Sequence, residues 1–194
     1  MYGARTLLAA QRSIVSAGFA YATWDPTHTG SNLVLSNANL TVTAPSGINA
    51  QFARATLSIA ADLLQWEITI NAIGGSGLAF VGIALAGSNY NTAKVGDDAS
   101  SWSYEADNGD KRTNATDSAY GSTYGTGAVV GVYLDAINGN LGFLLNGVDQ
   151  GLAFSGLTGP FYPAFTPYNS GQGTANFGPT LQYPKSGYTP GPHS

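Results

Sequence analysis

Apolar and polar residues alternate most clearly in the stretch LLQWEITI, residues 63–70. In an extended chain the two kinds of residue point to opposite sides. The apolar set is Leu64, Trp66, Ile68 and Ile70, and the polar set is Gln65, Glu67 and Thr69. A period of two residues is typical of a strand with one buried face. The stretch therefore predicts a β-strand whose apolar side packs on a core.

Similar short stretches follow one another along most of the chain, separated by turn residues. Asn138-Gly139 and Asn146-Gly147 are hairpin signals, because Asn and Gly tolerate the positive φ of tight turns. No helical pattern alternates with the strands, so a parallel βαβ sheet is excluded. Roughly ten short strands predict an all-β fold, an antiparallel sandwich or barrel. Besides 63–70, the expected strands lie within residues 32–43 (two strands), 52–59, 79–85, 101–106, 128–136, 140–145, 151–154, 161–167 and 173–178.

The two ends of the chain differ from this pattern. Residues 4–17 carry a helical apolar face, and such a short helix is marginal alone in water. Residues 1–22 are therefore predicted to be an N-terminal docking arm, with a helix and a frayed terminus both left open. The β domain is expected over 23–187 and a C-terminal tail over 188–194; the Pro- and Gly-rich segment 183–194 is either a strap or a loose end. The docking residues of the arm are Leu7, Leu8, Ile14 and Val15.

Composition narrows the range of partners. Only 9% of the residues are charged and the formal net charge is −4. Seven basic residues are spread from Arg5 to Lys185, which argues against nucleic acid, since that partner needs a clustered positive surface. The chain has no Cys, and no apolar run is long enough for a membrane span. Gln11, Arg12 and Ser13 interrupt the apolar run near the N-terminus, so a secretory signal is not expected.

Catalytic and metal-binding candidates are few. His28 and His193 have no neighbours in the sequence that suggest a catalytic triad. Glu67 and Glu105 lie on or at the end of predicted strands, and most of the other acids lie in predicted loops, where solvation is the commoner role. The segments GDD (96–98) and DNGDKRTN (107–114) resemble metal-binding turns only in part, and the second lacks the terminal Glu of an EF-hand loop. We expect no enzymatic activity, no cofactor and no metal site.

Aromatic and basic residues gather between positions 90 and 124, interleaved with Asn, Asp and Ser. Tyr and Trp offer rigid contact area, and Arg is frequent at interface hot spots. Trp102 and Tyr104 could instead be core residues of the SWSY strand, and for Trp102 we favour this core position over contact with a partner. The other four residues, Tyr90, Lys111, Arg112 and Tyr124, are expected to be exposed. The predicted binding residues are Tyr90, Trp102, Tyr104, Lys111, Arg112 and Tyr124.

Several motifs, in order along residues 23–187, resemble the SPRY domain family. The segment RATLSIAADLLQWEITI (54–70) is similar to the family's R-A-T strand pair, and FVGIAL and SWSY follow it. The later motifs are VGV with Asp135, Phe143 with Asn146-Gly147, GLAF (151–154), YPA (162–164) and NFG (176–178). Departures occur at Ala128, at Leu145 and at residues 61–64, where the family has Asp, Lys and a Gly-Lys-Trp turn. They affect the surface more than the fold.

The resemblance implies a concanavalin-like sandwich of two antiparallel sheets. SPRY domains bind proteins or peptides through loops at one end of the sandwich and are not enzymes, so the same is expected here. Burying each large apolar side chain would contribute roughly 1.5–3 kcal/mol. The expected core residues are Trp66, Ile68, Val132, Leu134, Phe143 and Phe177.

The passage from LSNANLTVT (35–43) into RATLSI (54–59) is most similar to SPRY domains of tailed-bacteriophage virion proteins. The main expectation is a non-enzymatic virion structural protein, a decoration, head-fibre or tail-appendage subunit assembled in the host cytoplasm. Its arm would contact other virion proteins, and it would be multicopy or a homo-oligomer. The first alternative is a receptor- or glycan-binding tail-fibre module that contacts a host-surface protein or glycan. The second is a cellular peptide-binding SPRY adaptor.

Overall fold

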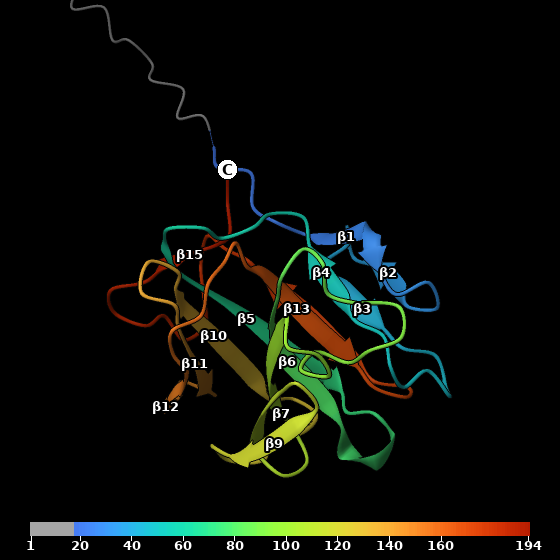
Figure 1. Ribbon diagram of the computed structural model, residues 1–194. Helices are drawn as coiled ribbons and strands as arrows, with labels where there is room; N and C mark the ends of the chain where they lie inside the picture. The colour runs from blue at the N-terminus through green and yellow to red at the C-terminus, as the bar shows by residue number, and fades with distance from the viewer. Residues whose placement is uncertain (1–17) are drawn as a thin grey trace, which may run out of the picture.

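A computed structural model describes residues 18–194, which fold into two antiparallel β-sheets packed face to face (Figure 1). The two-sheet sandwich expected from the alternation and from the SPRY resemblance is confirmed. The predicted docking residues Leu7, Leu8, Ile14 and Val15 lie outside the described residues.

Within residues 18–194 the first sheet has seven strands in the order β1-β4-β13-β6-β7-β8-β9. Three of them, β1, β8 and β9, were not expected from the sequence. The bounds are β1 Trp24–Thr29, β4 Ala53–Ala55, β13 Tyr162–Pro167, β6 Ala79–Ala84, β7 Ser101–Glu105, β8 Asp110–Thr113 and β9 Thr116–Ala119.

The second sheet of the described region has eight strands, seven of them in the order β12-β11-β10-β5-β14-β3-β2. The eighth strand, β15, pairs in parallel with the start of β5. The bounds are β12 Val148–Phe154, β11 Asn140–Leu145, β10 Val129–Asp135, β5 Leu63–Ala72, β14 Gln172–Asn176, β3 Thr41–Thr43, β2 Val34–Ser36 and β15 Thr189–Pro190. The described residues also contain a single 3-10 turn, η1 Gly75–Gly77, which lies between β5 and β6.

The main core fills the space between the sheets. Every expected core residue is at most 2% exposed: Trp66, Ile68, Val132, Leu134, Phe143 and Phe177. The period of two in the sequence therefore identified the inner faces correctly.

A second, smaller core lies on the outer face of the first sheet. Residues 85–100, between β6 and β7, cover this face, and Val95 packs there with Phe52, Phe80 and Ala164. The segment is hydrogen-bonded to the sheet: Val95 N–H donates to Thr166 Oγ1 at 3.1 Å, and Ser103 Oγ donates to the Val95 carbonyl at 2.8 Å. All six residues of β6 are buried for this reason.

The outer face of the second sheet is covered by residues 181–192, which we call the C-terminal strap. Gln65 Nε2 donates to the Tyr183 carbonyl at 2.7 Å, and Lys185 N–H donates to Gln65 Oε1 at 2.6 Å. Gln65 and Glu67, the polar side of the clearest predicted strand, are only 0% and 2% exposed. Of the strap and the loose end left open by the sequence, the structure shows the strap.

The two ends of the described chain lie side by side (Figure 1). Ser194 N–H donates to the Ala20 carbonyl at 3.0 Å, and Ala22 N–H donates to the Pro192 carbonyl at 2.9 Å. We call this end of the sandwich the terminal end. Residues 20–22 of the predicted arm and residues 192–194 of the predicted tail are thus joined to each other on the sandwich.

Candidate binding surface

Four loops meet at the end of the sandwich opposite the termini, where β1 and β13 finish. We call this the loop end; it comprises residues 30–33, 44–52, 73–78 and 168–171. Asn169 links three of these loops. Its N–H donates to the Ile48 carbonyl at 2.8 Å, its Oδ1 accepts from Gly47 N–H at 2.8 Å, and its carbonyl accepts from Gly75 N–H at 2.7 Å.

The backbone at this junction is left-handed, with φ of 30° at Asn169 and 69° at Ser170. Asn adopts positive φ more readily than most residues. Close approach also excludes larger residues, since a Cβ on Gly74 would lie 1.6 Å from the Tyr168 carbonyl oxygen. The loop end is therefore a fixed shape built by Asn and Gly.

Tyr90 lies on this end, in the segment that covers the first sheet. Its hydroxyl donates to the Thr27 carbonyl at 3.2 Å, and its ring meets Phe52 edge to face, with centroids 6.4 Å apart. Its backbone carbonyl accepts from Phe52 N–H at 3.1 Å. The side chain is half-buried. Tyr90 thus presents a rigid, partly exposed ring whose conformation is already set by the fold.

His28, on β1, packs against Tyr90 with ring centroids 5.7 Å apart. Its Nδ1 lies 2.7 Å from Asp25 Oδ2. Partial burial acts to raise the pKa of Asp25, but the hydrogen bonds from Thr27 and His28 outweigh burial and lower it. The histidine and the carboxylate hold each other in place, and the imidazole packs against the ring of Tyr90.

Uncharged polar groups complete the loop end. Ser31 N–H donates to Asn91 Oδ1 at 2.9 Å, and Asn32 N–H donates to Gln51 Oε1 at 3.0 Å. A shallow hollow of about 250 Å³ opens beside these loops, lined by Pro26, Thr29, Gly30, Ser31, Leu33, Leu35 and Asn39. The arrangement offers aromatic contact, amides and hydroxyls, which suit a neutral polar chain.

Tyr124 and Tyr104 were predicted to contact a partner, but both are buried. Tyr124 is 9% exposed and its hydroxyl donates to the Tyr104 carbonyl at 2.8 Å; Tyr104 is 0% exposed and donates to the Ser122 carbonyl. Burial raises the pKa of Tyr104 to about 12. The expectation of an exposed Tyr124 is therefore wrong, because both phenols close the interior of the sandwich.

Trp102 takes the inward position that we favoured. It is half-buried at the edge of the main core, and its ring meets Phe161 edge to face with centroids 6.1 Å apart. It lies on β7, on the inner side of the first sheet, as Tyr104 does.

Lys111 and Arg112 are engaged within the fold. Lys111 Nζ donates to the Ala153 carbonyl at 2.7 Å. Arg112 pairs with Asp97 at 2.9 Å and with Asp117 at 2.5 Å, and only 13% of its side chain is exposed. Burial acts to lower the pKa of Arg112, but these two carboxylates outweigh burial and raise it. The expectation of freely exposed basic contacts is therefore wrong for both.

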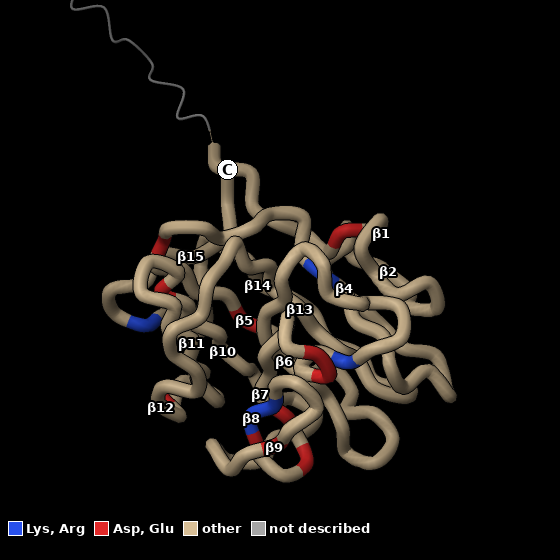
Figure 2. Tube along the Cα trace, viewed as in Figure 1, with Lys and Arg blue, Asp and Glu red and all other residues tan. Residues whose placement is uncertain are grey.

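Figure 2 shows the same result across the molecule, with basic and acidic residues close together around β7, β8 and β9. Of the six predicted binding residues only Tyr90 lies at the loop end, and its binding role stays a prediction. Sequence reasoning missed Asn169, His28, Asn91 and Ser31. The Tyr-Asn-Ser-Gly run at 168–171, rich in residues that tolerate positive φ, was the available signal for the junction.

Two further findings concern residues 18–194. Within them, no group of three or more His, Cys, Asp or Glu side chains is arranged to hold a metal ion. None of the helical structure described there is long and apolar enough to cross a membrane.

Comparison with known proteins places this geometry in context. The SPRY domain model matches residues 64–180. Among curated proteins, the chain is 29% identical over 165 residues to a Ran-binding proteins 9/10 homolog of Drosophila melanogaster, covering 80% of this chain and 17% of that protein. It is 31% identical over 163 residues to Ran-binding protein 9 of Xenopus laevis, covering 80% of this chain and 30% of that protein. The chain thus spans less than a third of the length of either relative.

A solved structure shows the same fold. The SPRY domain of human HERC1 superimposes with a TM-score of 0.65 at 20% identity, covering 81% of this chain and 96% of that domain.

Proposed function

The chain belongs to the SPRY domain family, and we propose that it is a non-enzymatic module that binds a peptide segment of a partner protein through the loop end. This is the cellular adaptor alternative. The relatives reported above, from Drosophila melanogaster and Xenopus laevis, favour it over a virion subunit.

The observation that carries the proposal is the junction of three loops at Asn169, at the same end as the partly exposed ring of Tyr90. A rigid aromatic side chain provides contact area at a small entropic cost, and preorganised loops lose little freedom on binding. The exposed polar side chains nearby are those of Ser31, Asn32 and Asn91, and hydroxyl and amide groups of this kind can hydrogen-bond to a peptide backbone as well as to side chains. An extended, uncharged polar peptide is the ligand that fits these groups.

The first test is selection from a random peptide library with the full chain, followed by affinity measurements on the selected peptides. We expect Tyr90→Ala to weaken binding about tenfold or more, a loss of at least ~1.4 kcal/mol. Phe19→Ala is the matched control, because Phe19 is 63% exposed and lies at the terminal end. Equal affinities for the wild type and Tyr90→Ala would rule out the loop end as the binding surface. The names of the relatives make Ran a protein partner to test in the same assay.

The virion subunit stays a second candidate, because residues 35–43 and 54–59 resemble the phage type of the domain. Its localisation in a particle, the copy number and contacts with other virion proteins or a host receptor are parts of that candidate. Mass spectrometry of purified particles from a producing host would detect the chain if this candidate is correct, and a glycan array would test the receptor form.

A further inference from the structure

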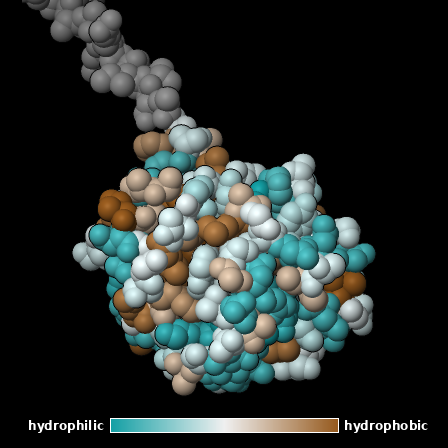
Figure 3. Space-filling view, in the orientation of Figure 1, coloured by the Kyte–Doolittle hydropathy of each residue, from teal (hydrophilic) through white to brown (hydrophobic). Residues whose placement is uncertain are grey.

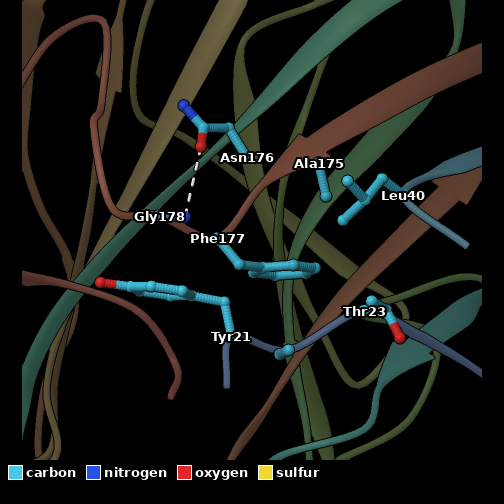
Figure 4. Close-up of a pocket in the computed structure, with 8 residues that line it drawn as sticks. Tyr21, Thr23, Leu40, Ala175, Asn176, Phe177 and Gly178 are labelled. Atoms are coloured by element: carbon cyan, nitrogen blue, oxygen red, sulfur yellow. Dashed lines mark hydrogen bonds between the residues drawn. The ribbon is translucent and has the colours of Figure 1, made fainter. Parts of the chain in front are cut away.

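A hollow of about 380 Å³ opens at the terminal end, where residues 1–17 join the sandwich (Figure 4). Its size is within the roughly 300–1,000 Å³ range of ligand pockets. Figure 4 shows the Phe177 ring at its centre, between Tyr21 and Leu40. Thr23 and Ala175 also line it.

The lining favours an apolar occupant. Phe177 and Ala175 are 2% and 3% exposed, so the hollow reaches down to the main core. The amide of Asn176, the polar side chain beside them, is already used: its Nδ2 donates to Glu67 Oε2 at 3.1 Å and to the Thr180 carbonyl at 3.0 Å. A polar ligand would find few free partners here, whereas an apolar side chain would remove apolar surface from water.

Residues 1–17 have the composition that this site requires. They include Leu7, Leu8, Ile14 and Val15, and their charged residues are Arg5 and Arg12, which give a formal charge of +2. The other five basic residues and all eleven acids belong to 18–194, which therefore has a formal charge of −6. The two parts attract each other at long range. Figure 3 shows only small, separate apolar patches on the face in view.

We propose that this hollow seats apolar side chains of residues 1–17 of the same chain, chiefly Ile14 and Val15. Ile14 is seven residues before Tyr21, which forms one wall, and seven extended residues span roughly 23 Å. Gly18 lies between them, and a Cβ there would meet nothing within 4 Å, so the chain has room to turn back. The short connection gives an effective concentration in the millimolar range, which favours the chain's own segment over that of another copy.

The test compares amide chemical shifts of the ¹⁵N-labelled full chain with those of an Ile14→Asp, Val15→Asp variant. We expect the amides of Leu40, Ala175 and Gly178, which are distant in sequence, to shift, and the loop end to stay unchanged. The matched control is Gln11→Asp with Ser13→Asp, which adds the same charge at polar positions and should leave these three amides in place. No shift at the three amides, or an equal shift in the control, would overturn the proposal.

A mixing experiment separates the chain's own segment from that of a second copy. Labelled double variant is mixed with an equal amount of unlabelled wild type. If the site is filled within one chain, the shifts at Leu40, Ala175 and Gly178 stay as in the variant alone. If the unlabelled wild type restores them, the occupant comes from a second copy and the proposal is wrong. Both results are independent of peptide binding at the loop end.

Discussion

At the scale of single residues, the most unusual group is Glu105, at the end of β7. Glu105 is 6% exposed, and its Oε2 is buried without a hydrogen-bond partner among residues 18–194. Burial is the largest effect and, together with Asp107 and Asp117, raises the pKa of Glu105 to about 7, while Arg112 and Lys94 act in the opposite direction. A carboxyl in this position is held in the neutral form up to nearly neutral pH.

This pKa predicts a loss of stability with rising pH. The ordinary pKa of the carboxyl is 4.5, so the unfolded chain releases the proton before the folded chain does. The stabilisation that this carboxyl contributes is complete below pH 4.5, decreases as the pH rises, and is lost above about pH 7. Over this range the free energy of unfolding falls by about 3 kcal/mol at most. We expect Glu105→Gln to be more stable than the wild type at pH 8 and to lose that advantage at pH 4.5, measured by urea unfolding.

Asp62→Asn is the control for this prediction, because Asp62 is an exposed acid that does not contribute to the raised pKa of Glu105. It should shift the urea midpoint by similar small amounts at both pH values. If the free energy of unfolding of the wild type and of Glu105→Gln changed with pH in parallel, Glu105 would not have the raised pKa and the prediction would be wrong.

At the scale of elements, one carboxylate accepts two of the hydrogen bonds that hold the C-terminal strap. Glu67 Oε1 accepts from Tyr183 N–H at 2.7 Å, and Glu67 Oε2 accepts from Gln182 N–H at 2.8 Å. A carboxylate is acceptor-only and can take several such donors, which fits two successive backbone N–H groups. The polar side of β5 thus binds another part of the same chain.

Glu67→Gln is expected to loosen the strap. The amide has one acceptor oxygen where the carboxylate has two, and hydrogen bonds to a charged group contribute about 1.5–3 kcal/mol. We expect a fall of that size in the free energy of unfolding, together with faster tryptic cleavage after Lys185, which lies in the strap. Asp62→Asn, at an exposed acid just before β5, is the control. Unchanged cleavage at Lys185 would contradict this role of Glu67.

At the scale of the whole molecule, side chains from the first sheet join it to the edge of the second. The pairing of β11 and β12 shifts between Gly142 and Leu144. Tyr120, just after β9, donates from its hydroxyl to the Gly151 carbonyl at 2.5 Å and accepts from Phe143 N–H at 3.2 Å. Side-chain contacts of this kind also cover part of the β12 edge, which would otherwise offer backbone groups to another strand.

Tyr120→Phe removes the hydroxyl and keeps the ring. It leaves the Phe143 N–H without this acceptor, so we expect a loss of about 1–3 kcal/mol in the free energy of unfolding. Faster amide exchange at Phe143 should accompany the loss. Tyr162→Phe is the control, since the ring of Tyr162 lies 4.1 Å from the Arg54 guanidinium, and Phe keeps that ring. An equal effect of the two substitutions would argue against a special role for Tyr120.

The sequence by itself determined most of the strands, though not β1, β8, β9 or β15, and the inner faces of the sandwich. Alternation is a local property, so Trp66, Ile68 and Val132 could be assigned to the core without knowledge of their partners. The Asn146-Gly147 pair likewise predicted the turn between β11 and β12, where both residues have positive φ.

The tertiary structure decided which polar and aromatic residues are free. Arg112 meets Asp97, Tyr124 meets Ala79, and Glu67 meets Tyr183, across gaps of 15, 45 and 116 residues. No local pattern reports such a pairing, because each residue type is equally suited to solvent or to a distant partner. The loop end depends in the same way on Asn169 meeting Gly47 across 122 residues, so it emerged only when the sheets were packed.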